Sequence, residues 1–265
     1  MTEAGELQDE QLLRYSRQIM LTQIDVAGQL RLRRARALVI GLGGLGSPVA
    51  MYLAAAGVGE LTLADHDRVD LSNLQRQLLH RTADIGARKT ESARARVLEL
   101  NPEVRTRLVG ERLAGQTLEA EAARADIVVD ATDNFASRFA INRVCARLRK
   151  PLVSGAAARF EGQVGVFDTR RPDSPCYRCL YPQEAADRRL SCDEAGVVAP
   201  LLGIIGSVQA LETMKVLMDI GRPLYGRLLL LDALRMEWQC LRLPRDPDCP
   251  DCGARPPPAA EPEEA

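Results

Sequence analysis

The chain has 265 residues, of which 46% are hydrophobic and 27% are charged, and its formal net charge is -1. This length suits one large α/β domain or two small ones, and the composition is that of an ordinary globular protein. A nearly neutral charge gives no support to binding of nucleic acid or of an anionic membrane, so neither is expected as a partner.

The chain carries no pattern of export or membrane insertion. Its first ten residues are acidic and lack an apolar core, so no signal peptide is predicted. The most apolar run, Val197 to Leu211, is shorter than the roughly 20 residues that span a bilayer, and we interpret it as a buried helix. The seven cysteines then predict reduced thiols and metal ligands, and a cytoplasmic protein.

The first elements in chain order predict a parallel βαβ unit that follows a surface helix over Leu12–Leu21. A short apolar strand, Ala37–Ile40, leads into a glycine cluster at residues 41–46. A helix begins there, with Pro48 in its first turn, where the missing N–H costs nothing. Glu60–Ala64 is the next strand.

Strands and helices keep alternating as far as Ser154, which predicts a Rossmann-like, doubly wound, mostly parallel sheet. The expected helices are Ala87–Leu100, Leu118–Arg124 and Arg138–Leu148, and the expected strands are Val104–Val109, Asp126–Asp130 and Pro151–Ser154. Beyond Gly155, antiparallel strands are expected to continue the sheet, over Gln163–Phe167, Gly226–Leu231 and Arg235–Leu243.

The glycine cluster predicts a nucleotide-binding turn. Gly41, Gly43 and Gly46 fit the pattern G-x-G-x-x-G, and Gly44 lies within it. N–H groups at a helix N-terminus bind phosphate, and glycines permit close approach. Asp65 ends the second strand, where a carboxylate can bind ribose hydroxyls. Alone, this pattern fits NAD, FAD or ATP, although the absence of Gly-Lys-Ser or Gly-Lys-Thr excludes a Walker-type loop.

Polar residues beside the later strands favour ATP. They lie at carboxyl ends of strands or in the adjoining loops, where open α/β sheets bind ligands. Cations that converge on phosphates, together with a carboxylate for Mg²⁺, are the groups that phosphoryl or nucleotidyl transfer requires. The residues concerned are Ser72, Asn73, Arg76, Lys89, Asp133 and Asn134.

Four cysteines form two C-x-x-C pairs, Cys176 with Cys179 and Cys249 with Cys252. Two such pairs are typical of a tetrahedral zinc site with four thiolates. A site closed by four protein ligands is structural, and here it would tie the C-terminal segment to the middle of the chain. A redox C-x-x-C is the alternative.

The segment Arg14-Tyr15-Ser16-Arg17-Gln18-Ile19, the glycine cluster and Leu71–Gln77 together resemble the ThiF/MoeB/HesA family, bacterial relatives of ubiquitin-activating enzymes. The resemblance extends from about Leu12 to Gly253, which is nearly the whole chain. The further matching stretches are Ser154–Ala157, Cys176–Cys179 and Glu194–Val197.

The resemblance implies an enzyme that uses ATP and Mg²⁺ to adenylate the C-terminal glycine carboxylate of a small ubiquitin-like sulfur-carrier protein. Asp133 would hold the magnesium ion. Arg14 would reach the nucleotide of the other protomer, which makes a homodimer the working unit. The residues implied to bind ATP are the glycine loop, Asp65, Asn73, Arg76 and Lys89.

The implied chemistry needs cations more than a general base. The carboxylate that attacks is already ionised near neutral pH, so the presence of only two histidines, His66 and His80, is no obstacle. The difficulty is to bring an anion to the α-phosphate of a polyanion. Arg14, Arg76 and Lys89, with Mg²⁺, would supply the needed charge.

We therefore interpret residues 1–253 as one adenylyltransferase domain, with a nucleotide-binding part at 12–155 and a carrier-binding and zinc part at 156–253. Residues 254–265 are rich in Pro, Ala and Glu and are expected to form a disordered tail. No rhodanese domain follows Gly253, so we expect a separate sulfur donor such as a cysteine desulfurase or rhodanese.

Cys192 lies in a polar loop, Asp187–Glu194, and a loop can carry a reactive thiol to a bound adenylate. In the thiamine branch of the family the matching cysteine takes part in sulfur transfer, and in the molybdopterin branch it is dispensable for activation. Both roles remain open. Cys145 and Cys240 lie within a helix and a strand pattern and are predicted core residues.

Several alternatives remain. An NAD- or FAD-dependent oxidoreductase explains the glycine loop but leaves the cations without a role. A non-catalytic partner of a ubiquitin-like protein would ordinarily lack the nucleotide residues. A relative that adenylates a small molecule or a peptide also fits. Among sulfur carriers, Ser154–Ala157 and Glu194–Gly196 favour the molybdopterin type over the thiamine type.

Overall fold

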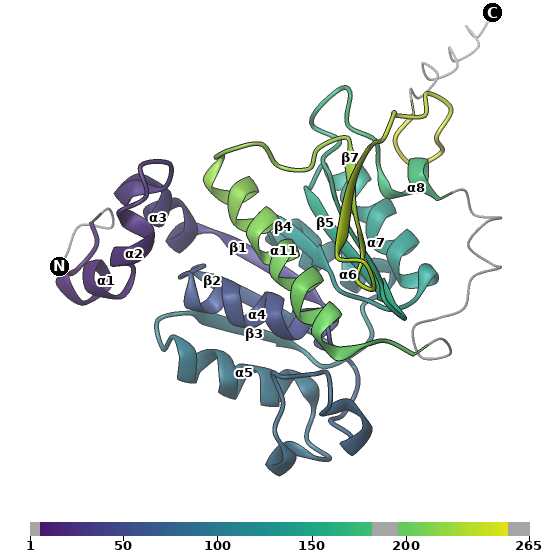
Figure 1. Cartoon of the computed structure of the whole chain (residues 1–265). Coiled ribbons are helices and arrows are strands. Elements are labelled where there is room, and N and C mark those ends of the chain that lie inside the picture. Colours follow the sequence, from purple (N-terminus) through teal and green to yellow (C-terminus); the bar gives the residue numbers. More distant parts are fainter. Residues whose placement is uncertain (1–5, 182–195, 254–265) are drawn as a thin grey trace, which may run out of the picture.

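The structure is a computed structural model that describes residues 6–181 and 196–253. Its centre is one eight-stranded sheet (Figure 1). In sheet order the strands are β3 (Arg105–Val109), β2 (Glu60–Ala64), β1 (Arg36–Ile40), β4 (Ile127–Asp130), β5 (Leu152–Ala158), β6 (Glu161–Phe167), β7 (Arg227–Asp232) and β8 (Glu237–Arg242).

The first five strands of that order run parallel, and β6, β7 and β8 are each antiparallel to the strand before them. The predicted Rossmann-like sheet with an antiparallel continuation is therefore confirmed. The chain crosses from β3, at one edge, to β4, beside β1, so the direction of winding reverses between β1 and β4.

Helices cover both faces of the parallel strands. α4 and α11 pack on one face with α5, and α6 and α7 pack on the other. The described helices are α1 (Asp9–Arg14), α2 (Ser16–Ile19), α3 (Asp25–Arg34), α4 (Gly46–Ala55), η1 (Leu71–Asn73), η2 (Thr82–Asp84), α5 (Lys89–Leu100), α6 (Gly115–Arg124), α7 (Phe135–Leu148), α8 (Tyr177–Leu180) and α11 (Ala199–Met218).

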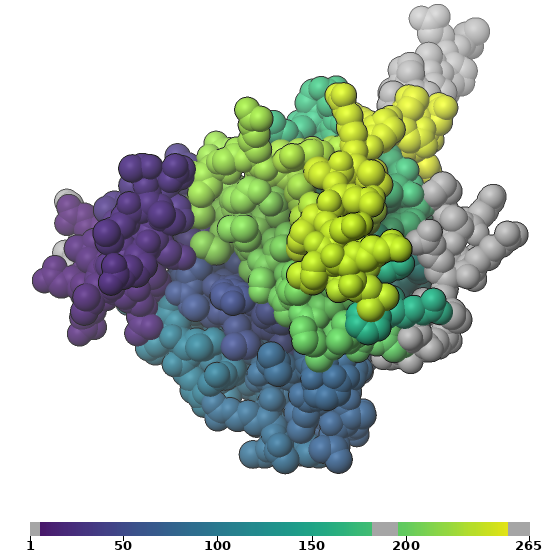
Figure 2. Space-filling model, viewed as in Figure 1, coloured from purple at the N-terminus to yellow at the C-terminus, as the bar shows by residue number. Residues whose placement is uncertain are grey.

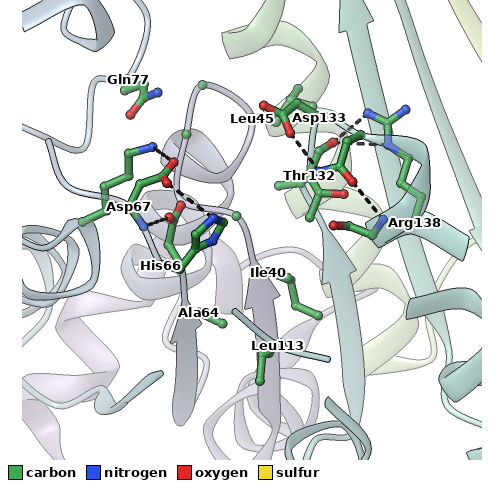
Figure 3. Close-up of a pocket in the computed structure, with 18 of the residues that line it drawn as sticks. Ile40, Leu45, Ala64, His66, Asp67, Gln77, Leu113, Thr132, Asp133 and Arg138 are labelled. Carbon is green, nitrogen blue, oxygen red and sulfur yellow. Dashed lines mark hydrogen bonds and ion pairs between the residues drawn. The ribbon is translucent and has the colours of Figure 1, made fainter. Parts of the chain in front are cut away.

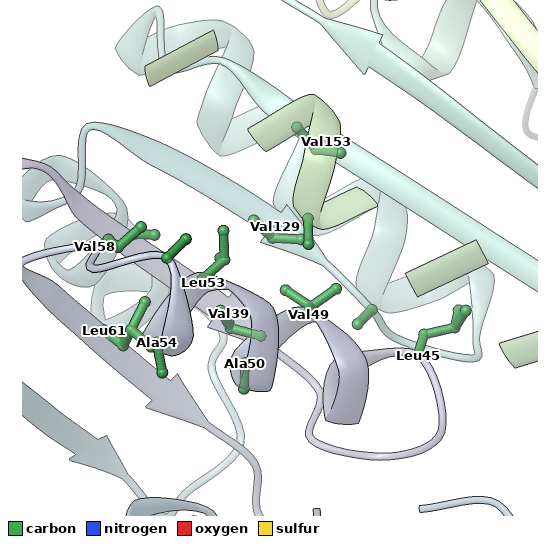
Figure 4. Close-up of a cluster of buried hydrophobic side chains, with 14 of the residues drawn as sticks. Val39, Leu45, Val49, Ala50, Leu53, Ala54, Val58, Leu61, Val129 and Val153 are labelled. Carbon is green, nitrogen blue, oxygen red and sulfur yellow. The ribbon is translucent and has the colours of Figure 1, made fainter. Parts of the chain in front are cut away.

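The core between α4 and the sheet forms because strand residues alternate between the two faces. Val39 and Val129 are fully buried on the α4 side, and Leu38 and Val128 are fully buried on the other. Small residues of α4, such as Ala50 in Figure 4, let the helix lie close to the strands. Burial on both faces makes these strands nearly continuous apolar runs, which is how the sequence identifies them.

The α11 helix is longer than predicted and continues to Met218. Glu212, which follows the apolar run in the sequence, is buried, pairs with Lys215 and accepts a hydrogen bond from the Leu224 N–H at 2.8 Å. A buried carboxylate satisfied in this way does not end a helix. By length and composition α11 can cross a membrane, yet half of its apolar stretch is buried, and it packs on α4 and β5 as the buried helix that was predicted.

Two sequence predictions are wrong. The single helix expected over Leu12–Leu21 is broken into α1 and α2 at Tyr15, because this side chain turns inward, where its hydroxyl accepts from Asn101 Nδ2 at 2.8 Å. Cys240 is exposed, because β8 forms the edge of the sheet and all six of its residues are exposed. Figure 2 shows this C-terminal segment, in yellow, on the surface of the molecule.

Cys145, by contrast, lies in α7 and is buried as predicted. Burial raises the pKa of the Cys145 thiol far above its ordinary value, so this cysteine is a core residue without the thiolate character that reactivity needs.

Candidate active site

A cavity of about 330 Å³ opens at the carboxyl ends of β1, β2 and β4. This is the crevice where the direction of winding reverses, the usual ligand position in open α/β sheets. Its volume lies at the lower end of the range for small-molecule sites, about 300–1,000 Å³. In Figure 3, Ile40, Ala64 and Leu113 lie at its base, between two polar walls.

Two glycines are required by the backbone of the turn after β1, and three glycines of this turn, Gly41 included, line the cavity. Gly41 has a φ of 90°, and a Cβ there would lie 2.7 Å from the Ala131 carbonyl oxygen. A Cβ on Gly46 would lie 1.9 Å from the Gly41 carbonyl oxygen. These two positions therefore require glycine for the turn itself. Gly41, Gly43 and Gly44 line the cavity, whereas Gly46 does not.

Asp65 both lines the cavity and holds the glycine turn. Its Oδ2 accepts from the Leu42 N–H at 2.7 Å, and its Oδ1 accepts from the Asp67 N–H at 2.9 Å. The carboxylate predicted to bind ribose is therefore fixed in orientation by the backbone around it.

One wall contains an ion pair between a buried lysine and an exposed aspartate. Lys89 is 5% exposed, and its Nζ lies 2.9 Å from Asp67 Oδ2. Burial opposes ionisation of Asp67, but the hydrogen bond and charge of Lys89 outweigh that effect and hold the Asp67 pKa below its ordinary value. Sequence reasoning chose Lys89 but missed Asp67, although its position two residues after Asp65 places both on one side of an extended segment.

The same wall carries Gln77, which sequence reasoning also missed. Its side chain is 5% exposed and lines the cavity, yet its Oε1 has no hydrogen-bond partner within residues 6–181 and 196–253. Buried acceptors are rarely left unsatisfied, so this oxygen fits a cavity meant to receive a donor from a ligand.

The opposite wall, at right in Figure 3, is the loop between β4 and α7. Asp133 and Asn134 line the cavity, and Asn134 Oδ1 also caps α7 by accepting from the Ser137 N–H at 2.9 Å. Arg138, 5% exposed, donates from Nη2 to the Thr132 carbonyl at 2.6 Å. Arg138 was missed, because only the first turn of α7 brings it to the wall.

A buried carboxylate supports this loop from below. Asp130 is fully buried, and its Oδ1 accepts from the N–H and the hydroxyl of Thr132 at 3.0 and 2.7 Å. Its Oδ2 accepts from the Ser154 hydroxyl at 3.0 Å. Burial raises the Asp130 pKa above its ordinary value, and these bonds offset part of that effect. The backbone that leads to Asp133 is thereby held in place.

Not every predicted residue lies at the cavity of its own chain. Arg76 lines it, but Ser72 and Asn73 do not. Ser72 accepts a hydrogen bond from Arg76 Nη1 through its carbonyl at 3.0 Å, so it positions the arginine. Arg14 donates from Nη1 to the Leu100 carbonyl at 3.2 Å, next to the start of β3 and thus at the amino-terminal edge of the parallel strands, opposite the cavity.

A second cavity, of about 380 Å³, adjoins the first. The two share Asp133, Arg138 and Ala157. The second is lined mainly by β5–β8 and by Tyr181, whose hydroxyl donates to Gln163 Oε1 at 2.8 Å. A ligand lying on the antiparallel strands can therefore extend to the first cavity.

The four predicted cysteine ligands meet at one point. Cys176, Cys179, Cys249 and Cys252 have sulfur atoms within 4.8 Å of one another, with separations of 3.4 to 3.9 Å between neighbouring sulfurs. Disulfides are much shorter, about 2 Å, whereas tetrahedral Zn–S bonds of about 2.3 Å place sulfurs about 3.8 Å apart. The cluster can therefore hold a metal ion. Cys192 lies outside the described residues, as does the tail at 254–265.

These features define a Rossmann-like α/β protein with a ligand cavity at its switch point and a cluster of four cysteines. The chain belongs to the ThiF family, whose model matches residues 15–251, so the resemblance predicted from the sequence is confirmed.

Two curated relatives match almost end to end. The chain is 47% identical over 249 residues to the molybdopterin-synthase adenylyltransferase of Escherichia coli K12, covering 94% of this chain and 99% of that protein. It is 46% identical over 247 residues to the sulfur carrier protein ThiS adenylyltransferase of the same organism, covering 93% and 97%. The crystal structure of E. coli MccB with ATP matches with a TM-score of 0.79 at 22% identity, over 96% of this chain and 77% of that one, which supports the fold alone.

Proposed function

We propose that the protein catalyses ATP-dependent adenylation of the C-terminal glycine carboxylate of a ubiquitin-like sulfur-carrier protein. A carboxylate oxygen attacks the α-phosphorus of ATP, and the bond from that phosphorus to the pyrophosphate oxygen breaks. The products are the carrier acyl-adenylate and pyrophosphate. The observation that carries the proposal is one cavity that joins the glycine turn to Asp65, Arg76, Lys89 and Asp133, in a chain nearly half identical to two such adenylyltransferases.

The cations at the cavity have the chemistry for this step. Lys89 has three N–H donors and donates one hydrogen bond to Asp67, so it can also bind a phosphate oxygen. Arg76 also lines the cavity and follows η1 in the chain. Fixed charges of this kind stabilise the charge that develops on the phosphates during transfer. An oxidoreductase would leave these cations without a role, so that function is not favoured.

Asp133 is proposed to hold Mg²⁺ on the bound triphosphate. It lies on the wall opposite Lys89, and carboxylate oxygen is the ligand that Mg²⁺ prefers. When bound, the ion would neutralise phosphate charge. Asp133 itself is presented by a loop whose backbone is held by Asp130 and Arg138.

The carrier tail is proposed to reach the nucleotide through the second cavity. Because the two cavities share Asp133, Arg138 and Ala157, an extended peptide lying along β5–β8 would end beside the α-phosphate. This assigns carrier binding to the 156–253 part and nucleotide binding to the 12–155 part.

Arg14 is proposed to act on the nucleotide of a second protomer. In its own chain it lies at the amino-terminal edge of the parallel strands, so only a homodimer can bring it to a cavity. The α1–α2 region that carries it, purple in Figure 1, exposes several apolar side chains that a partner copy can cover. These are Leu12, Leu13, Met20 and Leu21.

The thiolate cluster is proposed to hold one structural Zn²⁺, bound by Cys176, Cys179, Cys249 and Cys252. Four protein ligands leave no position for water, so the ion would clamp the C-terminal segment onto α8 rather than act on substrate. Reduced thiols of this kind suit a cytoplasmic enzyme.

The carrier is proposed to be of the molybdopterin-synthase type, with the thiamine-type carrier as the second candidate because the two relatives are almost equally similar. Sulfur is proposed to come from a separate cysteine desulfurase or rhodanese. Transfer through Cys192 remains a prediction, tested by comparing adenylation with thiocarboxylate formation in Cys192→Ser.

The proposal is tested by carrier-dependent exchange of labelled pyrophosphate into ATP, measured with purified carriers of both types. Exchange is expected with one of them and is expected to disappear when the carrier lacks its terminal glycine. Exchange with neither carrier, together with thermal stabilisation by NADH and not by Mg²⁺–ATP, would refute the proposal and favour an oxidoreductase.

A further inference from the structure

We propose that His80 is a positioning residue for the nucleotide loop: its Nε2–H group holds the Leu42 carbonyl from behind, and the Ser92 hydroxyl contacts the other ring nitrogen and orients the ring. The inference rests on the proposed function, because it treats the glycine turn as the phosphate cradle of ATP. His80 itself does not line the cavity and touches no substrate.

Side chains from two other segments of the chain bind the backbone of Leu42. His80 is 6% exposed, and its Nε2 lies 2.9 Å from the Leu42 carbonyl oxygen. From another segment, Asp65 Oδ2 accepts from the Leu42 N–H at 2.7 Å. The Leu42 side chain is fully buried. Both backbone groups of this one loop residue are therefore bound by side chains distant in the sequence.

The planar peptide group links the Leu42 carbonyl to the Gly43 N–H at the cavity. The Leu42 carbonyl and the Gly43 N–H belong to the same peptide group, and in a planar trans peptide they point in opposite directions. A carbonyl held toward His80 therefore directs the Gly43 N–H away from His80. Gly43 lines the cavity, so a phosphate oxygen bound there could accept a hydrogen bond from this N–H group.

The hydrogen bond to the Leu42 carbonyl determines the tautomer of the His80 ring. A carbonyl oxygen only accepts, so Nε2 must carry a proton. Nδ1 lies 2.8 Å from Ser92 Oγ, which is also 2.7 Å from Asp84 Oδ2. The Ser92 hydroxyl has a single proton for these two acceptors. The Ser92 hydroxyl donates to Asp84 Oδ2 and shares that proton with Nδ1, and Asp84 also accepts from the Arg81 N–H at 2.9 Å.

Protonation of His80 would leave the Ser92 hydroxyl donating to Asp84 alone and the Nε2–H in place. Burial lowers the His80 pKa and the Lys89 charge acts the same way, against the Leu42 carbonyl, Asp65 and Asp84, which raise it. The net direction is down, so the ring is neutral at neutral pH. Because Nε2 carries a proton in either form, the contact with the loop survives the titration.

The tautomer can be measured in the unaltered protein. The chain has only two histidines, so ring ¹⁵N chemical shifts are assigned with a single His66→Gln variant. We expect His80 as the neutral Nε2–H tautomer at pH 7.5. The neutral Nδ1–H tautomer would overturn the proposal, since its Nε2 lone pair would face the Leu42 carbonyl.

A matched pair of variants tests the consequence. In His80→Gln the amide nitrogen can replace Nε2, whereas in His80→Asn it can replace only Nδ1 and does not reach Leu42. Calorimetry with Mg²⁺–ATP and no carrier is expected to give a Kd within about 3-fold of the parent for His80→Gln and about 10-fold weaker for His80→Asn, the scale of one lost hydrogen bond.

Equal ATP affinity in the parent and His80→Asn would overturn the positioning role, and so would a His80→Gln variant as weak as His80→Asn. If His80→Asn does not fold, the tautomer and His80→Gln still decide. A parent protein that binds no ATP would instead refute the proposed function, and the ring tautomer, measured without nucleotide, still tests the contact with Leu42.

Discussion

The two ends of the sheet are stabilised in different ways. Every residue of β4, in the parallel end, is buried between layers of helices, whereas every residue of β8, at the antiparallel edge, is exposed. The parallel end depends on apolar packing on both faces. At the antiparallel end, β6 is still packed by α11 but β8 lacks such packing, and the segment after β8 brings Cys249 and Cys252 beside Cys176 and Cys179 of the α8 region.

This difference separates two tasks. The loops of the first cavity extend from strands whose positions are fixed by the core, which suits the proposed orientation of the ATP phosphates to within a fraction of an ångström. The exposed strands leave a broad surface for a protein partner. Four sets of variants test this contrast.

The largest effect is expected at the thiolate cluster. Cys249→Ser should abolish the proposed zinc binding and lower the free energy of unfolding by about 4 kcal/mol or more, because metal binding to such a cluster is folding free energy. Calorimetric unfolding together with the zinc content per chain measures this. Cys240→Ser, at an exposed position, is the matched control and should change neither. An unchanged unfolding temperature in zinc-free Cys249→Ser would show that the clamp is not needed.

At the nucleotide cavity a substitution should cost activity and not stability. Asp133→Ala should lower carrier-dependent pyrophosphate exchange by at least about 100-fold, since one charge-stabilising group is lost. Asp173→Ala, an exposed acidic residue that lines neither cavity, serves as the control. A folded Asp133→Ala protein with normal exchange would show that the assigned role is wrong.

Within the two ends of the sheet, truncating apolar side chains should have unequal effects. Val129→Ala, at a fully buried position of β4, should lower the free energy of unfolding by about 2 kcal/mol. Leu241→Ala, on β8 and 45% exposed, should change it by less than about 0.5 kcal/mol. Urea denaturation of both variants measures the difference, and equal losses of unfolding free energy would contradict the proposed difference between the two ends of the sheet.

The smallest effect concerns pH. The folded-state pKa of His80 lies below its ordinary value of 6.5, so between these two pKa values the unfolded chain binds a proton that the folded chain does not. The free energy of unfolding should therefore fall as the pH drops through that window, by at most about 1.4 kcal/mol per pH unit. His80→Gln should remove this slope. The same slope in parent and variant would place its origin elsewhere.

The sequence predicted most reliably where one physical rule acts over several residues. Strands buried on both faces are apolar throughout, so Ala37–Ile40 and Glu60–Ala64 could be placed closely. Because loops at the carboxyl ends of parallel strands meet at one edge, Asp65, Lys89 and Asp133 were expected together, and the cavity joins them.

The remaining features depend on three-dimensional partners that a linear pattern does not specify. Nothing in the sequence pairs Lys89 with Asp67, and nothing shows that Gln77 keeps an unsatisfied acceptor. Cys240 lies in a strand with the alternation of a half-buried one, and only its place at the sheet edge exposes it. Tyr15 breaks a helical pattern because its hydroxyl meets Asn101, a residue far along the chain.

The most direct test of the central claim is the intact mass of a sulfur-carrier protein after incubation with this protein and Mg²⁺–ATP. The proposed function predicts a carrier heavier by one adenylyl group, with the increase lost when pyrophosphate is added. A carrier of unchanged mass, under conditions where calorimetry shows ATP bound and the carrier bound, would contradict it.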